Sequence, residues 1–351
     1  MTYADFLTKT RFANLDGIRF LSILAVMWHH ARPNSVAGIE VLDRGFLGVD
    51  FFFVLSGFLI TTLLLRERRR TGTIALRGFY LKRALRILPV YLFVVGFVSA
   101  IYILAKGEGQ YLRVLPYYLL FLNNFLTEHI PMLEITWSLA VEEHFYAVWP
   151  VFLVLVPSRF WLPLVGLAIG VNVAGIMGVF GAGPAVGALR FALPNATYAP
   201  IIMGAGLVVL LDRDAGYARI SRAVSGRYAA VVCMAALMGA IALAPLDLRG
   251  LPNLLIHSLM TLTLAALVVR EDCPGLRWLQ APVVVRVGMV SYGIYLYHLI
   301  GLDLTGRVLG TLGVGSDWAL LVCYALISFA MAEVSFRTLE AYFRRFRPKA
   351  G

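Results

Sequence analysis

The chain has 351 residues, of which 60% are hydrophobic and 15% are charged, and its formal net charge is +11. Soluble domains contain about 45–50% apolar and about 25% charged residues, so the composition excludes an ordinary soluble protein. The three cysteines, Cys233, Cys273 and Cys323, are scattered without a CxxC spacing, which argues against a disulfide framework and against a zinc site.

The hydrophobic residues are gathered in long runs that short polar loops separate. A run of about 17 or more apolar residues crosses a hydrocarbon core of about 30 Å as a helix, and in lipid the backbone must satisfy its own hydrogen bonds. We therefore predict an all-α, polytopic transmembrane helix bundle with ten spans, near residues 15–31, 46–65, 86–105, 137–156, 160–180, 198–211, 228–245, 253–269, 288–304 and 317–340. The segment 113–126 is apolar but short and contains Pro116, so it is either an eleventh span or a re-entrant or interfacial piece.

The distribution of charge predicts the orientation. Loop 66–86 holds eight basic residues and one acidic residue, and loops 212–227 and 270–287 and the C-terminal tail up to Lys349 are also basic. Because Lys and Arg are enriched in cytoplasmic loops, this pattern explains the positive charge without a nucleic-acid partner. If 113–126 does not cross, all four basic segments are cytoplasmic. We therefore expect both termini in the cytoplasm, and one membrane domain that fills residues 1–351.

The first predicted span carries Arg19 and, eleven residues later, His30. Ionisable residues inside a span are costly and are therefore candidates for function. Eleven helical residues make about three turns and rise about 16 Å, so the two side chains share one face. Such a face can hold an anionic head at Arg19 and present a reactive tail to His30. The structural alternative is that Arg19 snorkels to the cytoplasmic surface and His30 is a packed polar residue.

Two segments that follow carry further candidates. Asp50 opens the second span, where it either caps the helix or orients a histidine, while Ser56 and Gly57 favour close helix packing. Arg83 and Arg86 are three residues apart and are therefore neighbours on a helix. They either bind phosphate in a bidentate manner or anchor a cytoplasmic loop.

The head of the fourth span carries Trp137, Ser138 and the run Glu142-Glu143-His144. A buried carboxylate can orient a histidine and stabilise its protonated form. Adjacent residues face different directions, so at most one of the two glutamates is expected to point into a cavity. The alternative is that all three ionisable residues lie at the membrane surface.

The ninth span carries Ser291, Tyr295 and His298 at helical spacing, so these three side chains line one face. They either bind a polar substrate or form part of an aromatic belt at the interface.

The chain resembles acyltransferase family 3, a family of bacterial membrane proteins, in five segments that follow the family's order over most of the chain. These segments are LDGIRFLSILAVMWHH, GFLGVDFFFVLSGFLITTLLLRE, FYLKRALRILPVYL, WSLAVEEHFYAVWP and SYGIYLYHL. The resemblance implies a multi-pass enzyme of the bacterial inner membrane that transfers an acyl group, usually acetyl, from acyl-CoA to a hydroxyl. Acceptors in the family carry carbohydrate: surface glycans, glycolipids, peptidoglycan, or glycosylated natural products such as macrolides. Some members have a C-terminal esterase-like domain, and none is expected in this chain.

The resemblance also implies roles for the matched residues. Arg19 and His30 match an arginine–ten residues–histidine motif, Arg83 and Arg86 match paired arginines, and Glu142 matches the glutamate of a WSL-x-x-E motif. We expect the arginines to bind the phosphates of acetyl-CoA, and His30 to catalyse transfer with Glu142 or Asp50 orienting it. No metal is expected. The residues expected to contact the acceptor are Trp137, Ser138, Tyr295 and His298.

Several alternatives stay open at this point. His30 either acts as general base on the acceptor hydroxyl or takes the acyl group itself. A transporter for a glycan-like substrate is a competing class, although the two related halves common in transporters are not evident. A non-catalytic assembly or sensor protein would leave His30 and Glu142 unexplained. Release of free CoA distinguishes the enzyme from both.

Overall fold

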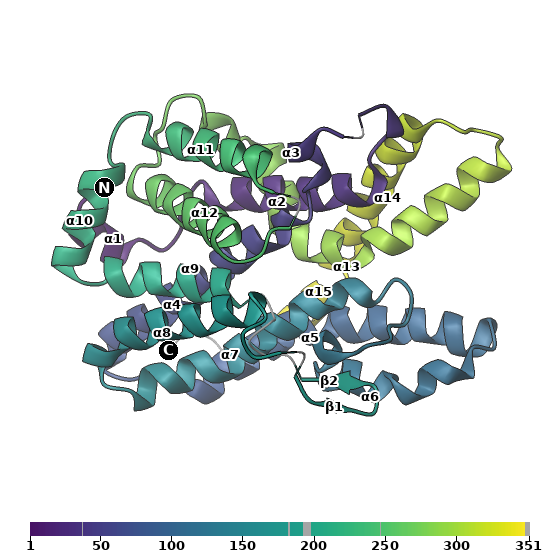
Figure 1. Ribbon diagram of the computed structural model, residues 1–351, viewed down its shortest axis with the longest axis horizontal. Helices are drawn as coiled ribbons and strands as arrows, with labels where there is room; N and C mark the ends of the chain where they lie inside the picture. Colours follow the sequence, from purple (N-terminus) through teal and green to yellow (C-terminus); the bar gives the residue numbers. More distant parts are fainter. Residues whose placement is uncertain (37, 182, 192–197, 246, 348–351) are drawn as a thin grey trace.

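The computed structural model describes residues 1–36, 38–181, 183–191, 198–245 and 247–347 as a bundle of helices (Figure 1). The helices are α1 (Tyr3–Thr8), α2 (Leu15–Ala31), α3 (Glu40–Asp43), α4 (Leu47–Thr71), α5 (Leu76–Ala100), α6 (Leu115–Leu119), α7 (Trp137–Leu155), α8 (Trp161–Ile176), α9 (Ala199–Leu211), α10 (Asp214–Val224), α11 (Ala229–Leu243), α12 (Leu251–Val269), α13 (Pro282–Thr311), α14 (Asp317–Arg337) and α15 (Leu339–Arg344). A π-helical turn, Ile101–Ala105, continues α5. Strands in the described residues are confined to a hairpin of β1 (Ala185–Val186) and β2 (Leu189–Arg190). The prediction of an all-α fold is confirmed.

Each predicted span coincides with a helix, but fewer than ten helices meet the length needed to cross a membrane unaided. Among the described residues, seven helical stretches are long and apolar enough, and an eighth results if α10 and α11, bent by 75°, form one span. Helix α2 has 17 residues and α9 has 13, against about 20 for a typical span. Helix α6 has five residues, so 113–126 does not form a helix that could cross. Ten crossings therefore stay a prediction.

Several helices extend beyond the apolar runs that predicted them. Helix α5 begins at Leu76 rather than near residue 86, α4 continues to Thr71, and α13 covers Pro282–Thr311. The added turns of α4 and α5 are rich in Arg and Lys, which are good helix formers and can reach the membrane surface through their long side chains. The basic loop 212–227 likewise contains a helix, α10, which hydropathy alone did not indicate.

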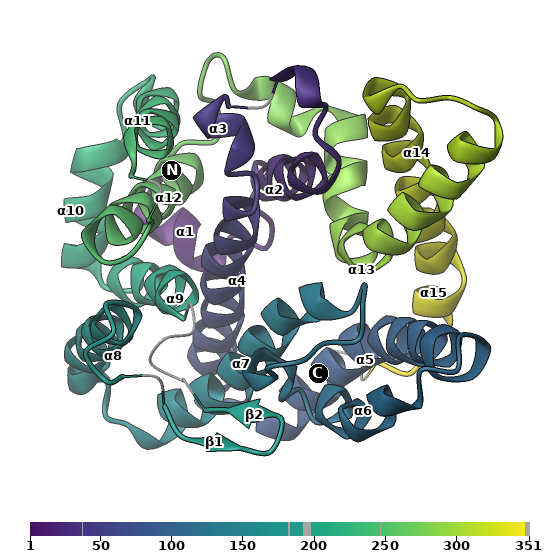
Figure 2. The ribbon, with the colours of Figure 1, turned by 45° about the vertical axis from the view of Figure 1, so that its right-hand side comes forward.

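Helix α4 runs through the middle of the bundle, with α8 to α12 on one side and α2, α13 and α14 on the other (Figure 2). Its contact with α9 is close because small residues meet there. A Cβ atom at Gly57 would collide with the backbone of Ile201, and one at Gly204 with the backbone of Val54. The expectation of close packing at Gly57 is therefore confirmed.

The N-terminus lies beside α10, at the end of the bundle that carries the basic segments (Figure 1). The Met1 amino group donates to the Val269 carbonyl at 3.2 Å, and Arg66 Nη2 donates to the Phe6 carbonyl at 2.8 Å. Helix α15 packs on α5, where Glu340 interacts electrostatically with Arg86. Loops 66–86, 212–227 and 270–287 and the described part of the tail are thus gathered at one end, while Lys349 lies outside the described residues.

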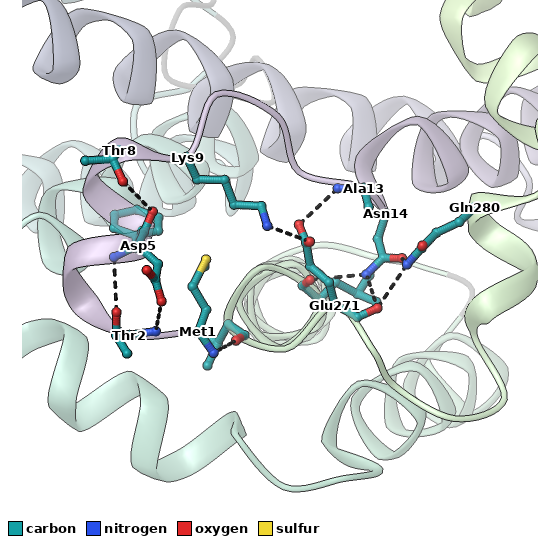
Figure 3. Close-up of polar contacts among 12 residues, drawn as sticks. Met1, Thr2, Asp5, Thr8, Lys9, Ala13, Asn14, Glu271 and Gln280 are labelled. Carbon is teal, nitrogen blue, oxygen red and sulfur yellow. Dashed lines mark hydrogen bonds and ion pairs between the residues drawn. The ribbon is translucent and has the colours of Figure 1, made fainter.

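A network of hydrogen bonds at this end joins the starts of α2 and α13 (Figure 3). Glu271 accepts from Lys9 Nζ at 2.7 Å and from the Ala13 amide at 3.0 Å. Gln280 Nε2 donates to Asn14 Oδ1 at 2.9 Å and to the Glu271 carbonyl at 3.0 Å. Asn14 precedes α2 and Gln280 precedes α13, so the network fixes the ends of two helices that line the cavities described below.

We expect Glu271→Ala to destabilise the fold by about 1–3 kcal/mol, because it leaves a partly buried amide and an ammonium group without their acceptor. The measurement is thermal unfolding of the detergent-solubilised protein. Asp272→Ala is the matched control, since the Asp272 side chain is 69% exposed and pairs only with Arg270 among the described residues. Equal unfolding midpoints for the two variants would contradict a structural role for Glu271.

Candidate active site

Two adjoining cavities lie inside the bundle. The smaller, of about 210 Å³, lies toward the end with the basic segments, between α2, α4, α5, α7 and α13. The larger, of about 630 Å³, lies toward the opposite ends of α2, α4, α7 and α12. Val49 and Tyr295 line both, so the cavities meet at these two side chains. We call them the arginine cavity and the histidine cavity, after the residues that line them.

The arginine cavity is lined by Arg19 from α2 and by Arg83 and Arg86 from α5. Arg19 Nη1 donates to Asp16 Oδ1 at 2.8 Å, which holds its guanidinium group in place. Arg83 lies over the ring of Tyr146, 3.9 Å from the centroid, and its buried Nε has no hydrogen-bond partner among the described residues. Guanidinium groups with free donors suit phosphate. The structure thus brings together the three arginines that the sequence singled out.

Glu142 also lines the arginine cavity. Ser56 Oγ donates to Glu142 Oε1 at 2.5 Å, which joins α4 to α7. Glu143 lines neither cavity, as expected for adjacent helical residues. His30 lies in the histidine cavity, so the structure places Glu142 with the arginines rather than beside the imidazole it was expected to orient.

The histidine cavity is lined by His30, Asp50 and Trp137, together with His29. Arg19 and His30 therefore face adjoining cavities. The two residues are separated by about 16 Å along the axis of α2. An elongated molecule that spans both cavities can contact a guanidinium group at one end and an imidazole at the other.

His298 lies against His30, with ring centroids 4.9 Å apart. Its side chain is fully buried, and Nδ1 is 2.6 Å from the Tyr295 carbonyl oxygen. A carbonyl oxygen only accepts, so Nδ1 carries the proton and Nε2 of the neutral ring is left as an acceptor. That Nε2 is buried and has no partner among the described residues. His298 thus offers a free acceptor close to His30.

Asp50 contacts a different histidine from the one expected. Asp50 Oδ2 lies 2.9 Å from Nε2 of His257, a residue of α12 whose side chain is 1% exposed. This contact occupies one carboxylate oxygen, while Asp50 still lines the histidine cavity. Asp50 was expected either to cap the helix or to orient a histidine. It contacts a histidine, but that histidine is His257 rather than His30.

Ser138 and Tyr295 form one hydrogen-bonded group at the junction of the cavities. Their hydroxyl oxygens are 2.8 Å apart, and both lie within hydrogen-bond distance of the Ile135 carbonyl. Each hydroxyl oxygen has two lone pairs, and this group uses at most one of them, so each oxygen can accept from a further donor. Ser291 lines the arginine cavity from the turn of α13 that precedes Tyr295.

Sequence reasoning missed several residues that the structure places at or beside the site, among them Ser56, His129, Tyr146 and His257. Ser56 was attributed to packing because serine beside glycine is common at helix contacts. His257 is a lone polar residue in an apolar run, and its cost in lipid was the available signal. Nothing in the local sequence distinguishes Tyr146 or His129.

Comparison with known proteins agrees with the motifs. The model of the acyltransferase domain of family 3 matches residues 12–334. The peptidoglycan O-acetyltransferase OatA of Listeria monocytogenes (serovar 1/2a, strain EGD-e) is 28% identical over 373 aligned residues, covering 95% of this chain and 56% of the relative. The O-acetyltransferase OatA of Staphylococcus aureus (strain NCTC 8325) is 32% identical over 158 residues, covering 42% of this chain and 25% of the relative.

The chain thus spans about half of one relative and a quarter of the other, as aligned. No solved structure matches it. The family model covers most of the chain, including both cavities and all five motif segments. The chain therefore belongs to acyltransferase family 3.

Proposed function

We propose that the protein transfers an acyl group, acetyl in the first instance, from acyl-CoA to a hydroxyl of a carbohydrate-containing acceptor. The observation that carries the proposal is the pair of adjoining cavities, one lined by three arginines and the other by His30. Guanidinium groups in the first cavity suit the phosphates of CoA, and the imidazole in the second can accept the proton of a reacting hydroxyl. The O-acetyltransferase names of the relatives agree with this chemistry.

In the proposed reaction the donor enters through the arginine cavity and its thioester reaches the junction near Tyr295. His30 removes the proton of the acceptor hydroxyl as the new O–C bond forms and the C–S bond breaks. The proton then passes to the departing thiolate, which leaves as free CoA. If His30 instead takes the acyl group first, an acyl-histidine forms between two transfer steps, and rapid quenching with labelled acetyl-CoA would trap it.

The basic end of the bundle is proposed to face the cytoplasm of a bacterium, with both termini on that side. Acyl-CoA is then bound from the side on which the arginine cavity lies, and the acceptor occupies the cavity toward the opposite face. The protein is accordingly placed in the inner membrane as a multi-pass protein, with Arg83 and Arg86 near the cytoplasmic surface.

The test is release of free thiol from acetyl-CoA by the purified protein in nanodiscs, with and without peptidoglycan fragments and simple glycosides as acceptors. Acceptor-dependent release, with the acyl group recovered on the acceptor, supports the proposal. A folded protein that releases no CoA from any acyl-CoA, while moving a glycan across the bilayer unchanged, would establish a transporter instead.

We further expect His298→Phe to lower kcat by about 10- to 100-fold, because it removes the acceptor that lies against His30. His298→Gln keeps an amide acceptor near the same place and should retain more activity. The KM for acetyl-CoA should change little in either variant, since His298 does not line the arginine cavity. A purely packing role predicts the reverse order, with phenylalanine the better replacement.

A further inference from the structure

Besides His30, the histidine cavity is lined by several other polar side chains. Its polar lining includes two amides, two carboxylates, imidazoles and the phenol of Tyr295, with the indole of Trp137 beside them. The amides are those of Asn124 and Asn253, and the second carboxylate beside Asp50 is Glu134. This mixture of aromatic, amide and carboxylate groups can bind a ring that carries several hydroxyl groups and has an apolar face.

Two acceptors in this lining lack a partner. The side-chain oxygens of Asn124 and Asn253 are both buried, and neither has a hydrogen-bond partner among the described residues. An amide oxygen buried without a donor is costly, and a bound ligand that donates O–H or N–H relieves that cost. These two atoms therefore favour a ligand rich in hydroxyl or amine donors.

The lining of this cavity contains no Lys or Arg among the described residues. Arg32 and Arg44 are near in sequence, but the first pairs with Asp43 and the second donates to the carbonyls of Ile241 and Ala244. Burial lowers the pKa of His129, which lies outside the membrane-spanning helices, and so favours its neutral form.

Carboxyl side chains, by contrast, line this cavity. Asp50 lines the cavity, and its Oδ2 lies 2.9 Å from Nε2 of His257. Glu134 lines the cavity with His129, with which it interacts electrostatically, and it forms no salt bridge with another described residue. The two cavities therefore differ in their ionisable groups: three guanidinium groups and one carboxylate line the first, and two carboxylates and three imidazoles line the second.

We infer that the histidine cavity selects acceptors whose entering unit is a neutral or amine-bearing polyhydroxylated ring, and that it rejects units bearing a carboxylate or phosphate. The inference rests on the proposed function and adds the acceptor class to it. An anionic unit would lose its hydration, meet Glu134 and Asp50, and find no cation to pair with. A bound neutral sugar would donate hydrogen bonds from its hydroxyl groups to the two amide oxygens. Its apolar face would pack against Trp137.

The experiment uses three glycosides that differ at one substituent: methyl glucoside, methyl glucosaminide and methyl glucuronide. Binding to the protein in nanodiscs is measured by saturation-transfer NMR, and transfer is measured by CoA release in the presence of each. We expect the glucoside and glucosaminide to bind and react, and the glucuronide to be at least about tenfold poorer in both assays.

Two variants make the test specific. Glu134→Lys should raise the relative use of the glucuronide by at least about tenfold, because it places a cation in the cavity. Glu128→Lys is the matched control: Glu128 lies on the same connection and pairs with Arg113, and it does not line the cavity. It should leave the preference unchanged.

Equal binding of all three glycosides, or no change of preference in Glu134→Lys, would overturn the inference while CoA release still supported the proposed function. Binding of none of the three would overturn it as well. Binding with the expected preference but no CoA release would uphold the acceptor class and count against the enzyme, so the two failures are distinguishable.

Discussion

His30→Ala is expected to abolish acyl transfer, with a fall in kcat of about 10²- to 10⁴-fold, while the protein still inserts and folds. The imidazole lines the histidine cavity and packs against the buried ring of His298. The two ring centroids are 4.9 Å apart. Steady-state CoA release at saturating acetyl-CoA measures the effect, and the KM for acetyl-CoA should change far less than kcat.

The control is another histidine of the bundle. His144 contacts the Tyr198 hydroxyl and stacks on Phe125, and it lines neither cavity. His144→Gln should therefore keep kcat within a few-fold of the unaltered protein. Size-exclusion profiles and unfolding midpoints of both variants establish that they are folded. Normal turnover by folded His30→Ala would remove His30 from the mechanism and leave the arginine cavity as a binding site only.

The sequence predicts well whatever depends on one helix. Helical spacing placed Arg19 and His30 on one face of α2 and at two levels of it, and the structure has them lining adjoining cavities. The same rule assigned Arg83 and Arg86 to one surface of α5. The apolar runs located every long helix, because in lipid hydropathy and helix formation coincide.

Contacts between distant helices were not predictable in the same way. Which histidine meets Asp50 depends on how α4 packs against α12, and 207 residues separate Asp50 from His257. The hydrogen bond from Ser56 to Glu142 crosses 86 residues. The local sequence predicts only that a buried carboxylate needs a partner. Which residue becomes that partner depends on how the helices pack. Helix ends were misjudged for a related reason, since hydropathy stops where arginine begins although the helix continues.

Removal of Arg83 or Arg86 should weaken donor binding more than it slows chemistry. Each guanidinium group can form charge-assisted hydrogen bonds to phosphate, worth about 1.5–3 kcal/mol apiece, and a tenfold change in affinity corresponds to about 1.4 kcal/mol. We expect Arg83→Ala and Arg86→Ala each to raise the KM for acetyl-CoA by about 10- to 100-fold, with a smaller fall in kcat. Because both line one cavity, the double variant should fall short of the product of the single effects.

The matched control is Arg77→Ala, on the same helix and exposed, which lines neither cavity. If positive charge near the surface were all that mattered, Arg77, Arg83 and Arg86 would behave alike, and lysine would replace each of them fully. If planar, two-point contact with phosphate matters, Arg83→Lys and Arg86→Lys recover only part of the loss. A donor lacking the phosphates, such as N-acetylcysteamine thioester, should then be used equally well by the parent and both alanine variants. A loss of activity with that short donor as large as the loss with acetyl-CoA would assign the two arginines to the structure of the bundle rather than to the donor.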